Sequence, residues 1–285
     1  MPELPEVETV RRGLERFVVG RSMREVFVTG TRSVRRQHPD ELVAALRGRR
    51  LDAARRWGKY LWIALAETGA SPGPTAVLVC HLRMSGQLLK VSPPLAPPPP
   101  HTHVRFVLDD ESELRFVDPR TFGELFVTDE LDQAGRPAVL AGLGPDPLLD
   151  GVDARRLGEL AARRRVSLKA LLLDQKVLAG IGNLYADEIC FAARLRPGRL
   201  VSSLGRAEVA RLAAAIGDVL AAAVAARGST LRDARYVDLL GEAGSYQDHH
   251  AVYGRAGEPC PRCDRPILQT RLVGRSAHYC ARCQR

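Results

Sequence analysis

The hydrophobic pattern of this chain changes once, near residue 152, and that change constrains its fold more than any other feature. Before it, apolar and β-branched residues gather in short runs separated by turn residues, which is typical of strands. After it, apolar residues recur at the spacing of helices. So many short strands favour a two-layer antiparallel sandwich, and the chain is predicted to be an α+β protein. The predicted strands are eight: 23–29, 49–56, 60–65, 76–82, 86–91, 104–108, 113–117 and 124–127.

Helices are predicted to flank the sandwich and to follow it. Between two of them, Gly180 and Gly182 punctuate a turn that opens a new helix. Glycines at such a place let the backbone approach a phosphate, and the helix N-terminus offers free N–H groups. A glycine-containing turn is also common in plain helical domains, so this turn alone decides nothing. The predicted helices are 5–18, 38–47, 153–164, 167–174, 183–194 and 206–227.

A chain of 285 residues is long enough for more than one core. Two stretches lack a clear period: the proline-rich residues 93–100, predicted to be a mobile or extended loop, and residues 228–255, predicted to be a flexible loop. The predicted domains are an N-terminal sandwich at 1–132, a linker at 133–152, a helical domain at 153–254 and a cysteine-rich ribbon at 255–285.

Four of the cysteines form two C-x-x-C pairs, Cys260–Cys263 and Cys280–Cys283, separated by sixteen residues. That spacing fits a zinc ribbon, in which each pair supplies two thiolates to one tetrahedral ion. Between the pairs, residues 267–273 are predicted to form a strand, and Gly274, Arg275 and Ser276 a tight turn. Disulfides are the alternative, but residues 1–16 lack the apolar core of a signal peptide, so we expect a reducing cytoplasm and a metal site. Cys80 and Cys190 lie in apolar segments and are predicted to be core thiols.

The basic charge of the chain is concentrated in its second half. Residues 1–152 carry 20 Lys and Arg against 20 Asp and Glu, whereas residues 153–285 carry 22 against 13, so the net charge of +9 belongs entirely to the second part. A basic excess beside a zinc ribbon favours a polyanionic partner such as nucleic acid, although a merely soluble basic surface would look the same. No apolar run reaches the length of a membrane span.

The first residues, Met-Pro-Glu-Leu-Pro-Glu-Val-Glu, suggest covalent chemistry. If Met1 is removed, Pro2 becomes a terminal secondary amine that can attack a sugar C1′ carbon and form an iminium. Such an amine titrates near pH 8, about two units below lysine. Glu3 and Glu6 place carboxylates beside it for proton transfer. Many chains begin Met-Pro, however, and acidic residues favour any helix N-terminus.

Together with these two ends, five internal motifs make the chain resemble the bacterial formamidopyrimidine-DNA glycosylase family, also called 8-oxoguanine DNA glycosylase/AP lyase. The motifs are Trp57-Gly-Lys-Tyr60, His81-Leu-Arg-Met-Ser-Gly86, Asp118-Pro-Arg-Thr-Phe-Gly123, Gly180-Ile-Gly-Asn-Leu-Tyr-Ala186 and Val252-Tyr-Gly-Arg255. The resemblance covers the full chain. It implies a bifunctional base-excision repair enzyme, a catalytic sandwich, a helix–two-turn–helix, a lesion-capping loop within 228–255 and one structural zinc ion.

The resemblance also implies roles for individual residues. Five residues are expected to form the catalytic set. Pro2 is expected to be the nucleophile, Glu3 the acid/base and Glu6 a supporting carboxylate, while Lys59 is expected to contact the lesion phosphates and assist elimination, and Arg275 to clamp the phosphates around the flipped nucleotide. Met84, Arg120 and Phe122 are expected to fill the gap that the flipped nucleotide leaves, because apolar wedges stabilise kinked DNA. Further DNA contacts are expected from His101, Arg165, Lys169 and Asn183. The expected partner is duplex DNA containing oxidised purines, bound by a monomer in the bacterial cytoplasm at the nucleoid.

Three rival functions remain open. The related endonuclease VIII group excises oxidised pyrimidines with the same amine but usually begins Met-Pro-Glu-Gly, whereas Leu4 fits the purine branch. A non-catalytic DNA-binding protein would not need Pro2, Glu3, Glu6 and Lys59 together. A zinc-ribbon module that binds RNA or protein would leave the N-terminus unexplained.

Overall fold

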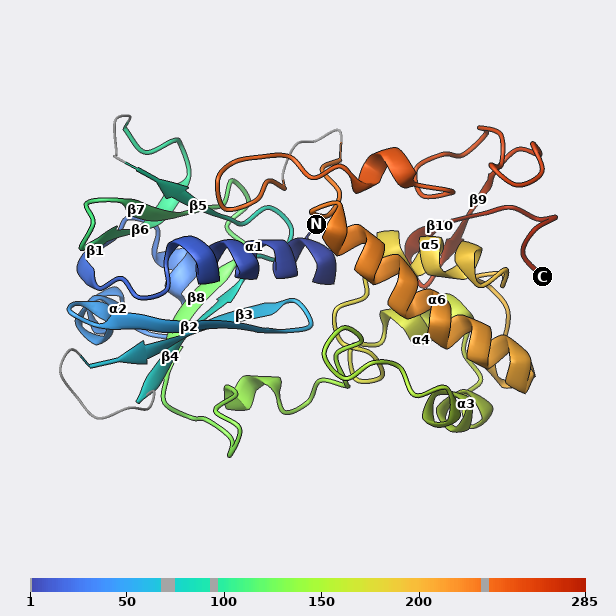
Figure 1. Cartoon of the computed structure of the whole chain (residues 1–285), viewed down its shortest axis with the longest axis horizontal. Helices are drawn as coiled ribbons and strands as arrows, with labels where there is room; N and C mark the ends of the chain where they lie inside the picture. The colour runs from blue at the N-terminus through green and yellow to red at the C-terminus, as the bar shows by residue number, and fades with distance from the viewer. Residues whose placement is uncertain (1, 68–74, 93–96, 232–235) are drawn as a thin grey trace. The chain divides into compact units, whose positions relative to one another are not determined.

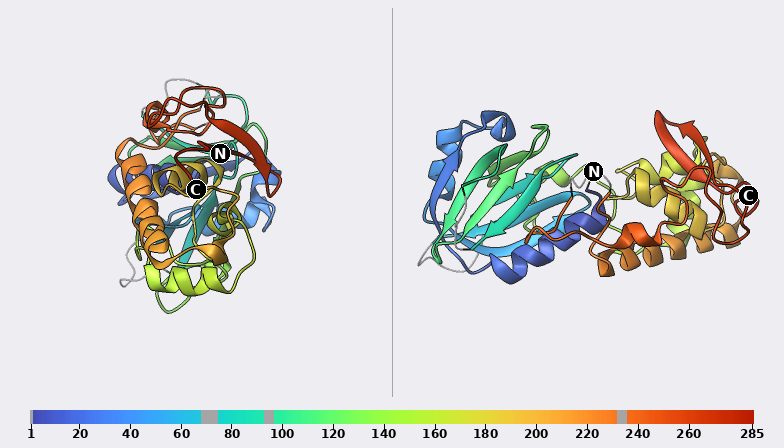
Figure 2. Two further views of the ribbon diagram at one scale, coloured as in Figure 1. Left: turned by 90° about the vertical axis from the view of Figure 1, so that its right-hand side faces the viewer. Right: turned by 90° about the horizontal axis from the view of Figure 1, so that it is seen from above.

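The computed structural model describes residues 2–67, 75–92, 97–231 and 236–285, which form two compact units (Figures 1 and 2). The first unit comprises Met1–Gly142 and Arg227–Ser245, and the second comprises Leu143–Ala226 and Tyr246–Arg285. Residues 93–96 of the predicted proline-rich loop and residues 232–235 of the predicted flexible loop lie outside the described residues.

The first unit contains two four-stranded antiparallel sheets, as the sequence predicts. Each observed strand begins and ends within two residues of its predicted bounds. One sheet has the order β1 (Met23–Val28), β6 (Thr102–Leu108), β7 (Glu113–Val117), β5 (Gln87–Val91). The other has the order β2 (Arg50–Trp57), β3 (Tyr60–Ala66), β4 (Ala76–His81), β8 (Glu124–Thr128).

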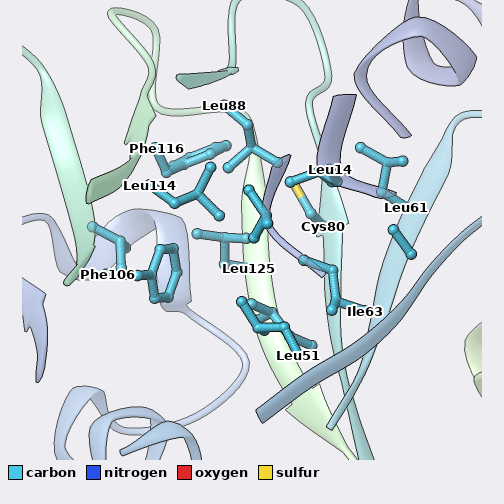
Figure 3. Packing of buried hydrophobic residues seen from close by; sticks show 14 of the residues in the cluster. Leu14, Leu51, Leu61, Ile63, Cys80, Leu88, Phe106, Leu114, Phe116 and Leu125 are labelled. Atoms are coloured by element: carbon cyan, nitrogen blue, oxygen red, sulfur yellow. The ribbon is translucent and has the colours of Figure 1, made fainter. Parts of the chain in front are cut away.

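The core of this unit lies between the two sheets. Figure 3 shows Phe106 and Phe116 from one sheet and Ile63 and Leu125 from the other pointing toward a common interior, and all four are at most 4% exposed. Alternation along each strand sends every second side chain inward, which is why the short apolar runs fold as sheets. The core also takes in residues of α1 (Leu4–Phe17) and α2 (Pro39–Leu46), close to their predicted bounds.

The described part of the 228–255 segment is anchored, so the prediction of a flexible loop there is wrong. Tyr236 and Leu239 are buried in the core of the first unit, and the carbonyl oxygen of Leu239 accepts the Lys90 N–H at 2.7 Å. A Cβ on Gly13 would lie 2.8 Å from the Leu239 Cβ, so the glycine makes room for the leucine. A few well-placed apolar residues anchor this segment without any helical or strand period.

The second unit is helical and ends in a β-hairpin. Its helices are α3 (Ala154–Ala162), α4 (Leu168–Leu173), α5 (Asn183–Ala192) and α6 (Arg206–Ala225), each within two residues of prediction. The long helix α6 packs against α3 and α5 (Figure 1). The hairpin consists of β9 (Leu268–Leu272) and β10 (Arg275–Tyr279). No helix in the described ranges is long and apolar enough to cross a membrane.

The hairpin turn lies one residue earlier than predicted. Val273 and Gly274 form it, with φ of +50° and +74°, and Arg275 already belongs to β10, where it pairs with Leu272. Two consecutive positive φ angles are what a two-residue type I′ turn requires, and glycine is favoured at such a position. The predicted Gly274-Arg275-Ser276 turn is therefore wrong.

Candidate active site and nucleic-acid interface

The start of α1 holds Pro2 and Glu3 in a buried position. Glu3 and Glu6 are 3% and 2% exposed. The Glu6 carboxylate accepts the Glu3 N–H at 2.8 Å through Oε2 and the Ser229 N–H at 2.8 Å through Oε1. A Cβ on Gly228 would approach Glu6 Oε1 to 2.7 Å, so only glycine fits beside this carboxylate. The Glu6 carboxylate thus holds the backbone at Glu3, three residues earlier in the chain.

Lys59 lies in the two-residue turn between β2 and β3. Gly58 precedes it with φ +58°, as the first position of a type II′ turn requires. The Arg56 guanidinium donates to the Gly58 carbonyl oxygen at 3.1 Å and to Glu8 Oε2 at 3.1 Å. Burial alone would raise the pKa of Glu8, but Arg11 and Arg56 outweigh it and lower that pKa. The Glu8–Arg56 pair therefore ties the Lys59 turn to the helix that follows Pro2.

His81 lies close to this turn as an uncharged ring. It packs edge-on against Tyr60, with ring centroids 4.4 Å apart, and its Nδ1 accepts the Arg83 N–H at 2.9 Å. Burial lowers the pKa of His81 to about 3, and the charges of Arg83 and Lys59 act in the same direction. A neutral imidazole here can accept from the Arg83 backbone and so shape the next loop.

Met84, Arg120 and Phe122 lie on two loops of the first unit. Met84 is 39% exposed and Phe122 40% exposed, so neither belongs to the core. The Arg120 guanidinium lies over the Phe122 ring, 4.7 Å from its centroid. The residues beside them in sequence, Arg83 and Thr121, have φ of +53° and +54°, a backbone region that costs non-glycine residues energy.

Asp118 connects these two loops. Its carboxylate accepts the Ser85 hydroxyl at 2.5 Å and the backbone N–H of Arg120 at 3.2 Å and Gly123 at 2.7 Å. Its own backbone N–H donates to the carbonyl oxygen of His101, an exposed residue with φ +67°. Because Asp118 is fully buried, it can hold these two loops in one arrangement.

Glu124 braces the same region from β8. Its carboxylate pairs with Arg36 at 3.0 Å, Arg83 at 2.8 Å and Arg35 at 3.5 Å, while its side chain is only 3% exposed. Burial would raise the pKa of Glu124, but the hydrogen bonds from Arg36 and Arg83 lower it below its ordinary value. Arg35 also donates to the carbonyl oxygen of Phe122, so the cluster supports that loop directly.

In the second unit, Asn183 begins α5 directly after the glycine-containing turn. Gln175 closes the turn by donating to the Ile181 carbonyl oxygen and accepting the Gly180 N–H, both at 2.8 Å. The Asn183 Nδ2 donates to Ser276 Oγ at 3.3 Å, whereas its buried Oδ1 has no hydrogen-bond partner in the described chain. Arg165 is exposed on the loop between α3 and α4.

Lys169 does not lie at the surface, so the prediction of a DNA contact for it is wrong. Its side chain is 0% exposed, and its Nζ donates to Asp187 Oδ1 at 2.6 Å and to the Ser276 carbonyl oxygen at 2.5 Å. A buried ammonium group is stable only when it is paired, and both partners here are internal.

The four ribbon cysteines meet at one point. Their sulfur atoms all lie within 4.8 Å of one another, with 3.9 Å between Cys260 and Cys283 and 3.5 Å between Cys263 and Cys280. Tetrahedral zinc with bonds of about 2.3 Å needs thiolates about 3.8 Å apart, so these residues fit one structural zinc ion. Arg275 is exposed at the start of β10.

Cys80 and Cys190 are buried outside this cluster, as predicted. Burial raises the pKa of each thiol well above its ordinary value, and this keeps both groups protonated.

Three family models cover most of the chain. The formamidopyrimidine-DNA glycosylase N-terminal domain matches residues 1–125, the H2TH domain of the same family matches residues 143–235, and a zinc finger found in FPG and IleRS matches residues 257–285. A β-sandwich, a helix–two-turn–helix and a four-cysteine finger in this order define a DNA glycosylase of base-excision repair. The chain belongs to the formamidopyrimidine-DNA glycosylase family.

Individual members of the family are similar to this chain over all or nearly all of their length. The formamidopyrimidine-DNA glycosylase of Nocardia farcinica is 46% identical over 290 residues, covering 100% of this chain and 98% of the relative. That of Geobacillus kaustophilus is 43% identical, with 100% of both chains covered. The MutM (Fpg) protein from Thermus thermophilus superposes with a TM-score of 0.83 at 40% identity, covering 99% and 98%. Lactococcus lactis Fpg, in complex with DNA containing N7-benzyl-Fapy-dG, superposes with a TM-score of 0.86 at 31% identity, covering 99% of each chain.

Sequence reasoning missed the residues that hold the candidate groups in place. Their signal was available, because each one lies in or beside a motif. Glu8 ends the first motif, Arg56 precedes Trp57, and Asp118 opens the Asp-Pro-Arg motif. Their place beside a motif can be read from the sequence, whereas their burial and their partners are seen only in the folded chain.

Proposed function

We propose that this protein is a bifunctional glycosylase and AP lyase that removes oxidised purines, 8-oxoguanine and formamidopyrimidines, from duplex DNA. The observation that carries the proposal is the buried start of α1, where Glu6 holds the backbone of Glu3 directly after Pro2. A rigidly held amine and carboxylate are what a covalent mechanism needs, because fixed geometry replaces a search in solution.

In the proposed reaction, the unprotonated Pro2 amine attacks C1′ and the glycosidic bond breaks. The electron pair of that bond leaves with the base, and the proton lost by the Pro2 nitrogen balances the proton that the base takes up. Glu3 protonates the ring oxygen O4′ as the sugar opens, which gives an iminium between Pro2 and C1′. Loss of a C2′ proton then expels the 3′ phosphate, and a second elimination expels the 5′ phosphate. Water then hydrolyses the iminium, which frees the Pro2 amine and releases the unsaturated five-carbon sugar fragment. The products are the free base, this fragment and a one-nucleotide gap with phosphate at both ends.

Other residues are proposed to bind DNA. The amine cannot reach a stacked base, so the nucleotide must flip out at a cost of a few kcal/mol. Exposed Met84 and Phe122, with Arg120 beside the ring, are suited to fill the gap and face the orphaned base. Lys59, His101, Arg165, Asn183 and Arg275 are proposed phosphate contacts, and zinc holds the ribbon that carries Arg275.

Three solved structures of relatives support the substrate class. The Lactococcus lactis protein forms complexes with DNA containing N7-benzyl-Fapy-dG or an abasic site, and MutM forms a complex with DNA containing carbocyclic 8-oxo-G. Leu4, in the N-terminal motif, also favours the purine branch. We propose that the enzyme acts as a monomer on the bacterial nucleoid.

Substrate choice is tested by borohydride trapping on two duplexes, one with 8-oxoguanine opposite cytosine and one with 5,6-dihydrouracil. We expect a covalent adduct predominantly on the first. An adduct on the second duplex alone would assign the chain to the pyrimidine-specific group. Binding without an adduct on either would favour a non-catalytic DNA-binding protein.

A further inference from the structure

Two consecutive buried carboxylates on α5 hold the hairpin of the zinc ribbon and the segment that leads into the ribbon. Asp187, which is 0% exposed, accepts the backbone N–H of His278 at 2.9 Å and lies 3.0 Å from its ring Nδ1. Glu188, which is 4% exposed, accepts the backbone N–H groups of three successive residues at 2.8–3.0 Å: Ala251, Val252 and Tyr253. One acid therefore holds the hairpin strand, and the next holds the segment that leads into the ribbon.

Lys169 joins this arrangement from α4. Its Nζ bridges Asp187 and the carbonyl oxygen of Ser276, the residue after Arg275. The Ser276 hydroxyl in turn accepts from Asn183 at the start of α5. The strand that follows Arg275 is thus bound at residue 276 and again at residue 278, to side chains of two helices.

Zinc does not supply this constraint. The metal fixes the four cysteines relative to one another, but the orientation of the ribbon on the helices depends on contacts outside the metal site. A buried ion pair often adds little net stability compared with apolar residues of similar size, so its presence here points to a positional role.

We propose that Lys169, Asp187 and Glu188 are positioning residues that hold Arg275 in register with Asn183, so that the two bind neighbouring phosphates as one unit. This rests on the phosphate-binding role proposed for Arg275 and Asn183. The DNA contact once expected of Lys169 is replaced by an indirect one, exerted through the strand that carries Arg275.

The decisive variant is Asp187→Asn, measured by binding to a duplex with a tetrahydrofuran abasic analogue over a series of salt concentrations. The substitution makes the protein more positive, so a purely electrostatic effect would tighten binding. Glu208→Gln is the matched control, because it makes the same charge change at an ion pair with Arg199 in the same unit. We expect Asp187→Asn to weaken binding about tenfold and to lower the salt slope by about one phosphate contact.

Arg275→Ala should lower the salt slope by the same amount as Asp187→Asn. Combining the two substitutions should lower the slope and the affinity little further, because both remove the same phosphate contact. Asp187→Asn leaves the Lys169 ammonium buried without its counter-ion, so the double variant Lys169→Met with Asp187→Asn is measured beside it. We expect the double variant to regain thermal stability and keep one zinc per chain, but not to regain the salt slope.

The proposal is overturned if Asp187→Asn binds as Glu208→Gln does, or if its effect simply adds to that of Arg275→Ala. If Arg275→Ala leaves the slope unchanged, the proposed role of Arg275 fails instead. Hydrogen exchange then decides the positioning separately: the His278 amide should exchange faster in Asp187→Asn than in Glu208→Gln, and equal rates would refute it.

Discussion

Arg56 donates to Glu8 at 3.1 Å, and this buried pair joins the strand before Lys59 to the second turn of the helix that follows Pro2. Its side chains are 1% and 10% exposed, so both charges lie largely out of contact with water. The two ends of the pair serve the two proposed catalytic elements of the first unit, the amine and the lysine.

Removing one member of this pair should be more harmful than removing both. We expect Arg56→Met, which leaves Glu8 buried with a weakened set of partners, to lower the free energy of unfolding by about 3 kcal/mol. Adding Glu8→Gln should recover part of that loss. Urea denaturation measures both effects, with Asp52→Asn, at an exposed ion pair with Arg50, as the control. Equal losses in the single and double variants would contradict the account.

Glu124 should make stability depend on acid pH. Its pKa lies below the ordinary value of 4.5 in the folded protein, so it stabilises the fold above that pH and the contribution is lost as pH falls through the folded pKa. Glu124→Gln should therefore lower stability at pH 6 but flatten the further decline below about pH 4.5. The urea midpoint measured between pH 6 and pH 3 tests this. Parallel curves for wild type and variant would show that Glu124 does not contribute.

Substitution of the proposed gap-filling wedge residues, Met84, Arg120 and Phe122, should change the rate of base excision far more than the free energy of unfolding. Phe122→Ala removes an exposed ring, so the free energy of unfolding should change by less than about 0.5 kcal/mol. If the ring supports the flipped state by about 1.4 kcal/mol, excision should slow about tenfold. Phe27→Ala is a close control, because Phe27 is 41% exposed in the same unit and also lies under an arginine, Arg105. Equal excision rates in the two variants would remove Phe122 from the proposed wedge.

Loss of zinc should impair the second unit, which carries the ribbon, and leave the fold of the first unit unchanged. Cys263→Ser removes one of four thiolates, and we expect weaker zinc retention and loss of high-affinity binding to the abasic-analogue duplex, because Arg275 is carried by the ribbon. The sandwich has its own core, so amide exchange in β2, β3 and β4 should stay as in wild type. Zinc release is followed with a chromogenic chelator. Unchanged DNA affinity after complete zinc loss would contradict the role given to the ribbon.

The sequence predicted the sheets and helices because each is encoded locally. Strand β7, for example, has the sequence Glu-Leu-Arg-Phe-Val, in which charged and apolar residues alternate before the final valine. It has turn residues on both sides, and its predicted bounds are the observed ones. Lys169 could not be placed in this way. The two groups that bury its charge are Asp187, 18 residues away, and Ser276, 107 residues away, and no local pattern connects them. The anchoring of Tyr236 and Leu239 was missed for the same reason, since their partners lie on the sandwich.

The candidate groups themselves were recognisable because short motifs carry them. The motifs could not predict the contacts that hold these groups in place, such as the hydrogen bond between Glu6 and Ser229 or the ion pairs of Glu124 with three arginines. Those contacts join segments that are far apart in sequence, so they become visible only when the chain is folded.

We assign the chemistry to the Pro2 amine, and mass mapping of the borohydride-trapped adduct on 8-oxoguanine DNA tests this assignment. We expect the sugar remnant to lie on the peptide beginning at Pro2, and we expect Pro2→Gly or retention of Met1 to abolish strand cleavage. A remnant on Lys59 or another lysine, or normal trapping by either altered form, would contradict it.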